Sequence, residues 1–173
     1  MTIRPRDSSV DELCDEIVAR YHVSLHGALP RIRGGLSALA AHGASAALQV
    51  MLAAFSELAD RIEANLAKEE NLLFPALEAL SDADREGRPR PALPFATVLH
   101  PIRVMEDEHV RIEQALERLH ELALAVAEPD TLSASWRQCM ADLSALDTEL
   151  REHHRTENEI LFPRALELER RVI

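Results

Sequence analysis

One eleven-residue segment occurs twice in this 173-residue chain, and the repeat limits what the chain can fold into. Residues 65–75 read NLAKEENLLFP and residues 153–163 read HHRTENEILFP, so the shared core is E-x-x-(Leu/Ile)-Leu-Phe-Pro. The two copies lie 88 residues apart, and His22 and His109 lie 87 residues apart. We therefore predict two copies of one helical hairpin, each contributing half of a common site.

Apolar residues recur at steps of three and four along four long segments, which is the spacing of amphipathic helices. On the second segment this apolar stripe includes Leu72 and Leu73. The polar, proline-rich run from Ser81 to Pro94 is predicted to be the one long connection. The predicted helices cover residues 11–41, 45–80, 99–127 and 131–168.

The composition favours helices over strands. With 5 glycines and 3% aromatic residues, the chain lacks the turns and the β-branched or aromatic runs of a β-sheet protein. The predicted fold class is all-α, an antiparallel four-helix bundle built from two pseudo-repeated hairpins. It is expected to occupy residues 10–170, after an N-terminal extension of residues 1–9.

The charge balance excludes two classes of partner. A formal net charge of -11 repels a phosphate backbone or an anionic bilayer, and no cluster of basic residues offsets it. No stretch approaches the roughly 18 apolar residues of a membrane span, and the protein is predicted to be cytoplasmic. Cys14 and Cys139 form no CxxC motif, so they are expected to be reduced, packed thiols.

Five polar side chains interrupt the apolar faces of the predicted helices. His109 takes a position where the stripe of its helix calls for leucine, and Glu69 lies one turn before two leucines. His153 and Glu157 lie on the apolar stripe of the last helix, and His22 lies on that of the first. Burying such groups is costly unless they are paired or bind a cation. We therefore predict that these five residues are metal ligands.

The spacing of these residues favours one shared metal centre. His153 and Glu157 are one helical turn apart, so their side chains can meet one ion. Glu69 occupies the repeat position equivalent to Glu157, and a shared metal would offset both charges. Imidazole and carboxylate ligands suit iron ahead of manganese or zinc. His26 is a weaker candidate, and His154 is expected to point away from His153 and is assigned no chemistry.

Several motifs stand in a fixed order between residues 10 and 168: Tyr21-His22 with Leu29-Pro30, Lys68-Glu69-Glu70 to Phe74-Pro75, Met105 to Glu108-His109, and Glu157-Asn158 to Phe162-Pro163-Arg164-Ala165-Leu166. With these motifs the chain resembles the hemerythrin-like family, and within it the iron-sulfur cluster repair di-iron proteins. The resemblance implies a four-helix bundle that holds two irons on four histidines and two bridging glutamates. Carried over by position, it implicates His22, Glu69, His109, His153 and Glu157.

The sixth ligand position of that family falls on Asn65, where the internal repeat also calls for histidine. Asparagine offers a weak, neutral amide oxygen. One iron would then have an open position, recruit His26 or water, or be lost to leave a single iron, and the sequence leaves these alternatives open. Longer members of the family also carry a small N-terminal domain with adjacent cysteines, which this chain is expected to lack.

The resemblance implies a function in iron metabolism. The leading hypothesis is an iron donor in the repair of iron-sulfur clusters damaged by oxidative or nitrosative stress, with iron-sulfur proteins as the recipients. A first alternative is a binder or reductant of oxygen, nitric oxide or peroxide at an open iron position. A second is a metal-poor helical interaction module with a degenerated site. The sequence leaves open whether the protein is an enzyme and whether it forms oligomers.

Overall fold

The computed structural model describes residues 8–41, 46–126 and 134–172, and these residues form four long helical rods. Their elements are α1 (Val10–Ile17), η1 (Val18–His22) and α2 (Val23–Ala41) in the first rod; α3 (Ala46–Lys68), η2 (Glu69–Leu73) and α4 (Phe74–Glu86) in the second; α5 (Leu99–Ala125) in the third; and α6 (Ala134–Thr156), η3 (Glu157–Leu161) and α7 (Phe162–Arg171) in the fourth.

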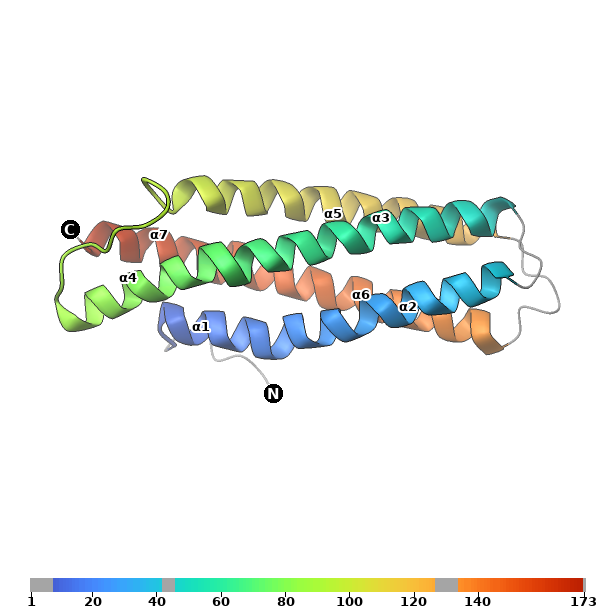
Figure 1. Ribbon diagram of the computed structural model, residues 1–173, viewed down its shortest axis with the longest axis horizontal. Coiled ribbons are helices and arrows are strands. Elements are labelled where there is room, and N and C mark those ends of the chain that lie inside the picture. The colour runs from blue at the N-terminus through green and yellow to red at the C-terminus, as the bar shows by residue number, and fades with distance from the viewer. Residues whose placement is uncertain (1–7, 42–45, 127–133, 173) are drawn as a thin grey trace.

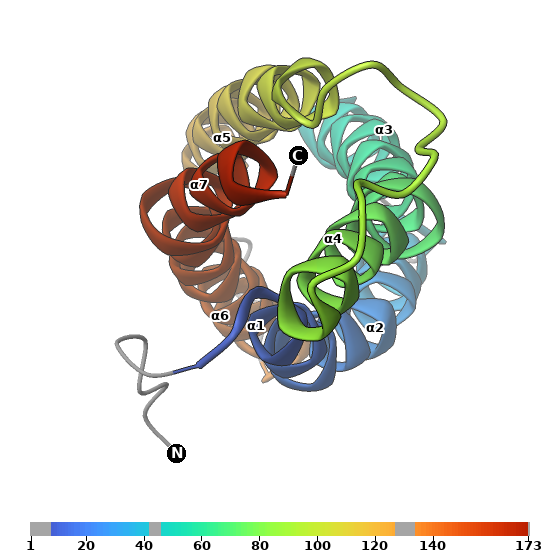
Figure 2. The ribbon, with the colours of Figure 1, turned by 90° about the vertical axis from the view of Figure 1, so that its left-hand side faces the viewer.

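The four rods run side by side and antiparallel to their neighbours in the chain (Figure 1). Seen from one end they form a ring around a common core (Figure 2), with α2 packed on α3 and α6, and α3 packed on α5. The described residues contain no strand. The predicted all-α four-helix bundle is therefore confirmed.

The second rod is longer than predicted. We expected it to end at residue 80, but α4 continues to Glu86 and ends at Gly87, whose φ of 62° lies in the left-handed region that glycine tolerates. Ser81 is buried and donates a hydrogen bond to Asp11 Oδ1 at 2.6 Å. This contact with α1 stabilises helix where local propensity favours a loop. The long connection therefore covers residues 87–98.

The other predicted helix ends differ from the observed ones by a few residues or fall outside the described residues. The fourth rod continues to Arg171 instead of residue 168, while α5 begins at Leu99 as expected. The predicted boundaries at residues 45, 127 and 131, and residues 1–7 of the predicted N-terminal extension, lie outside the described residues. Cys14 and Cys139 are buried free thiols, as expected.

Both copies of the repeat contain a π-helical turn, in which the helix widens by one residue. The N–H of Phe74 bonds to the carbonyl of Glu69, and the N–H of Phe162 bonds to that of Glu157, five residues back in each case. A proline follows each phenylalanine. Because proline cannot donate an N–H and its ring crowds the preceding turn, a wider turn just before it relieves the conflict. The motif thus places each glutamate at the start of a π-helical turn.

Leucine and isoleucine make up most of the core, which also contains three fully buried phenylalanines, Phe55, Phe74 and Phe162. We expected both Leu72 and Leu73 to face inward, but only Leu73 is buried, while Leu72 is 43% exposed. The π-helical turn explains the error, because the added residue rotates the stripe away from the regular helical spacing. Within the described residues, no helix has the length and apolar character needed to cross a membrane.

Candidate metal centre

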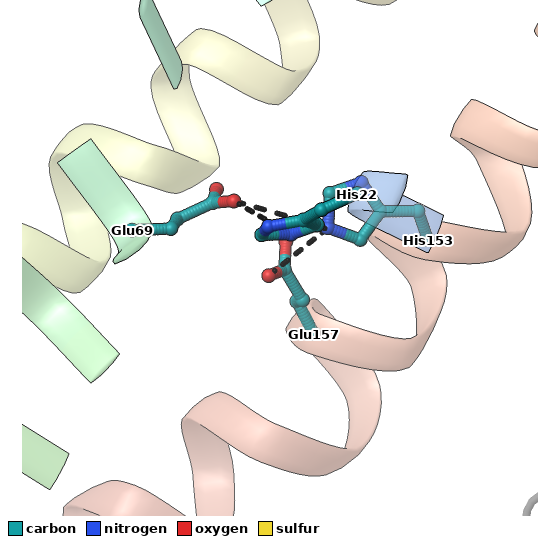
Figure 3. A group of neighbouring side chains, drawn as sticks. All are labelled: His22, Glu69, His153 and Glu157. Atoms are coloured by element: carbon teal, nitrogen blue, oxygen red, sulfur yellow. Dashed lines mark hydrogen bonds and ion pairs between the residues drawn. The ribbon is translucent and has the colours of Figure 1, made fainter. Parts of the chain in front are cut away.

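Four fully buried side chains from three rods converge in the core (Figure 3). They are His22 at the end of η1, Glu69 at the start of η2, His153 on α6 and Glu157 at the start of η3. One ligand atom from each lies within 4.8 Å of the corresponding atom of the others. The π-helical turns of both repeat copies thus bring the two glutamates to one point.

One side of this cluster holds two histidines. His22 Nε2 lies 3.2 Å from His153 Nε2 and 3.4 Å from Glu69 Oε2. His153 Nε2 lies 3.2 Å from Glu157 Oε1. We call His22, His153, Glu69 Oε2 and Glu157 Oε1 the first half-site.

The other side holds one histidine and an asparagine. His109 Nε2, on α5, lies 3.2 Å from Glu157 Oε2 and 3.6 Å from Glu69 Oε1. Asn65, on α3, is buried and donates a short hydrogen bond from Nδ2 to Glu69 Oε1. We call His109, Asn65, Glu69 Oε1 and Glu157 Oε2 the second half-site. Each glutamate therefore presents one oxygen to each half-site, which is the arrangement of a carboxylate that bridges two ions.

Several buried polar atoms of the cluster lack a hydrogen-bond partner among the described residues. They include Glu69 Oε2, both carboxylate oxygens of Glu157, His109 Nε2 and Asn65 Oδ1. An unsatisfied buried polar atom costs about 1 to 3 kcal/mol, and more if it is charged. A cation in each half-site would satisfy these atoms. Nitrogen and oxygen donors without sulfur suit iron, so the residues present fit the expected metal.

Without a cation, protons have to balance the two glutamates. Burial and the charge of Glu157 raise the pKa of Glu69 to about 7. Burial alone would lower the pKa of His109, but its contacts with Glu157 and Glu69 raise it to about 10. Burial would raise the pKa of Glu157, yet the charge of His153 and the close contacts with His153 and His109 lower it. Metal binding therefore has to displace protons from this cluster.

The structure brings together all five residues that the sequence analysis selected as ligands, together with Asn65. It does not bring in His26, which is exposed and whose Nε2 lies 3.5 Å from Glu70 Oε1 on the outer side of His22. His26 therefore does not take the place of the missing histidine in this arrangement.

We assigned no role to His154, but its ring lies against that of His109. It is buried, and its ring stacks on that of His109 with the centroids 4.0 Å apart and the planes 7° apart. Its Nδ1 lies 3.3 Å from Glu113 Oε1 on α5. Burial and the neighbouring His109 charge lower the pKa of His154 to about 2, so the ring is neutral. Its position four residues after Leu150 was the signal that it faces a neighbouring helix.

Comparisons with known proteins give one matching family and several relatives. The family described as the hemerythrin HHE cation binding domain matches residues 100–172. The iron-sulfur cluster repair protein YtfE of Edwardsiella ictaluri is 31% identical over 163 residues, which are 93% of this chain and 68% of that protein. YtfE of Yersinia pseudotuberculosis is 30% identical over 152 residues, covering 87% and 63%. YtfE of Musicola paradisiaca is 31% identical over 171 residues, covering 93% and 68%. The chain thus spans 63% to 68% of the length of these relatives.

Proposed function

The chain belongs to the hemerythrin HHE family, and from this membership and the site geometry we propose that it is an iron carrier that donates iron in the repair of damaged iron-sulfur clusters. One observation carries the proposal. Glu69 and Glu157 each direct one oxygen toward His153 or His22 and the other toward His109, so the buried cluster can hold two ions side by side. The names of the related YtfE proteins supply the connection to cluster repair.

The ligand set supports donation of iron in one direction. His22 and His153 would hold one ion, His109 and Asn65 the other, with the two carboxylates between them. All of these ligands are nitrogen or oxygen atoms, whereas an incomplete iron-sulfur cluster offers soft thiolate and sulfide ligands, which bind iron strongly. An iron ion released from the present site would fill the empty metal position of such a cluster. Transfer from this site to a thiolate site is therefore favourable.

The inequality of the half-sites supports release of one ion. The first half-site has two imidazole nitrogens, whereas the second has one imidazole and the amide of Asn65. A neutral amide oxygen is a weaker donor than an imidazole nitrogen for iron. We propose that the ion in the second half-site is the cargo, and that the ion in the first half-site is retained.

The experiment is a transfer assay under anaerobic conditions. The protein is loaded with ferrous iron, desalted, and mixed with a cluster-free iron-sulfur protein, sulfide and thiol. We expect the recipient to regain its cluster absorbance and activity, at the expense of about one iron per chain. The matched control is the E69A/E157A double variant treated in the same way. No restoration, or equal restoration by the control, would overturn the donor function.

A second function has one observation in its favour. Asn65 leaves the second half-site short of a strong ligand, so an ion there can accept a small molecule such as nitric oxide or oxygen. The same iron-loaded protein would then show a reversible absorption change under the gas, and N65H would reduce it. Gas binding without iron transfer would favour this function over donation.

A further inference from the structure

We infer that Glu70 and Asn158 are positioning residues that set the iron affinities of the two half-sites apart, with Glu70 strengthening the first and Asn158 leaving the second weak. This inference rests on the proposed iron centre and concerns the residues behind its histidines. It assigns a role to two side chains that touch no ion themselves.

The two residues hold corresponding histidines from behind. His22 Nδ1 lies 2.8 Å from Glu70 Oε1, and His109 Nδ1 lies 3.0 Å from Asn158 Oδ1. In both cases the ring nitrogen donates to a side-chain oxygen, which turns Nε2 toward the glutamates and leaves it as the nitrogen that can bind a metal. Glu70 directly follows Glu69, and Asn158 directly follows Glu157. The two hydrogen bonds are therefore the same contact, made once in each copy of the repeat.

The two acceptors differ in charge. Glu70 is a carboxylate, so its hydrogen bond from His22 is charge-assisted and increases the electron density of the imidazole. Asn158 accepts the corresponding bond with a neutral amide oxygen of similar geometry, which fixes the His109 ring but adds no charge. Both arrangements orient their histidine, and only the first one makes it a stronger ligand.

Two independent differences between the copies act on the same half-site. Asn65 stands where the other copy has His153, and Asn158 stands where the other copy has Glu70. Asn65 replaces a ligand of the second half-site, and Asn158 weakens the support of its remaining histidine. Because both changes lower the iron affinity of the second half-site, they leave the first half-site tight and the second weak.

Isosteric variants separate charge from orientation. Glu70→Gln keeps an oxygen that accepts the His22 bond but removes the charge, and Asn158→Asp keeps the geometry at His109 but adds a charge. Glu159→Gln and Asn71→Asp are matched controls, because they make the same charge changes at exposed positions of the same two π-helical turns. Anaerobic calorimetric titration with ferrous iron gives the affinity of each binding step.

For the natural protein we expect a tight step and a weak step. Loss of a residue behind a metal-bound histidine typically costs about 10- to 100-fold in metal affinity, so E70Q should weaken the tight step by about tenfold or more. N158D should strengthen the weak step by about tenfold, or produce a second step where the natural protein shows none. The two control variants should shift neither step by more than about twofold. The apoproteins should unfold at similar urea concentrations.

Three results would overturn the inference. E70Q and N158D could leave both steps unchanged, could change the same step, or could act no more strongly than E159Q and N71D. Each result would contradict the claim that the charge difference between Glu70 and Asn158 sets the two half-sites apart. The outcome is separable from that of the proposed function: a natural protein that shows both graded steps but fails to restore a cluster retains the inference and loses the donor role. Successful iron transfer by the natural protein, with unchanged binding steps in E70Q and N158D, would retain the donor role and contradict the inference.

Discussion

The two half-sites of the metal centre come from the same duplicated unit but differ in their ligands. The first has His22 and His153, and the second has His109 and Asn65. The backbone around them has kept its symmetry: η2 and η3 have equal lengths, and each is followed by Phe-Pro. The shared motif therefore fixes where the glutamates lie, while single side chains fix how strongly each half-site binds.

The two histidine rods differ as well. The first rod widens into η1 at Val18–His22, so the consecutive residues Tyr21 and His22 are both buried. In the third rod α5 runs uninterrupted past His109, and Glu108, the residue equivalent to Tyr21, is half-buried. Tyr21 stacks on His153 in the first half-site, whereas His109 is covered by His154. The first half-site is thus covered by a tyrosine ring and the second by a histidine ring.

The largest expected effect is the loss of both half-sites. Replacing both Glu69 and Glu157 by alanine takes away every oxygen that connects the half-sites, so bound iron should fall from its natural content to nearly none. Metal analysis after anaerobic reconstitution and desalting measures this loss. E159A is the control, since it removes an exposed carboxylate from the same turn as Glu157. Full iron content in the double variant would show that the metal binds elsewhere.

The pH dependence of the metal-free protein reports on the second half-site. The contacts of His109 with Glu157 and Glu69 raise its pKa from 6.5 to about 10, so the folded state holds a proton that the unfolded state has released. This stabilisation is full below pH 6.5 and is lost as the pH rises through 10. Between pH 7 and pH 9 the free energy of unfolding should fall by about 2 kcal/mol.

Urea denaturation of the metal-free protein at pH 7, 8 and 9 measures this slope, and H109Q should flatten it. The measurements begin at pH 7 because burial lowers the pKa values of His22 and His154. At lower pH these two histidines make the free energy of unfolding rise with pH, which would oppose the effect of His109. A stability that rises between pH 7 and pH 9 in the natural protein would contradict the placement of His109 between the two carboxylates.

The smallest expected effect tests the symmetry of the backbone. Phe74 and Phe162 are equivalent in the repeat, and their rings stack on His22 and His109 with centroids 5.7 and 6.0 Å apart. F74L and F162L should each lower the free energy of unfolding by about 1 kcal/mol, because both keep an apolar side chain but lose ring contacts. Denaturation of the metal-free variants should give equal costs within about 0.5 kcal/mol. Clearly unequal costs would show that the hairpins no longer share one packing.

Much of this fold could be predicted from the spacing of apolar residues, because four long amphipathic segments have few other ways to bury their stripes. The errors have local causes. Leu72 is exposed because the π-helical turn breaks the regular period, and α4 extends past Ser81 because that residue bonds to Asp11 on another rod. Contacts between distant segments are not visible in a local pattern.

The candidate site was predictable where side chains break an apolar stripe, as His109 and Glu157 do. The role of Glu70 was not, since it is half-buried and looks like an ordinary surface carboxylate until the fold places it behind His22. His154 was missed for a related reason, because adjacent residues on a helix face different directions and the bundle buries more than one of them. His26 appeared suitable by spacing, but it lies on the outer side of Glu70.

Iron content and affinity in the natural protein and in N65H test the central claim most directly, with N65A as the variant that removes the amide without adding a ligand. We predict that after reconstitution with ferrous iron and exhaustive chelator dialysis the natural protein retains about one iron per chain, that N65A does the same, and that N65H retains about two. Two equally tight irons in the natural protein, or no gain in N65H, would contradict the claim that position 65 makes the half-sites unequal.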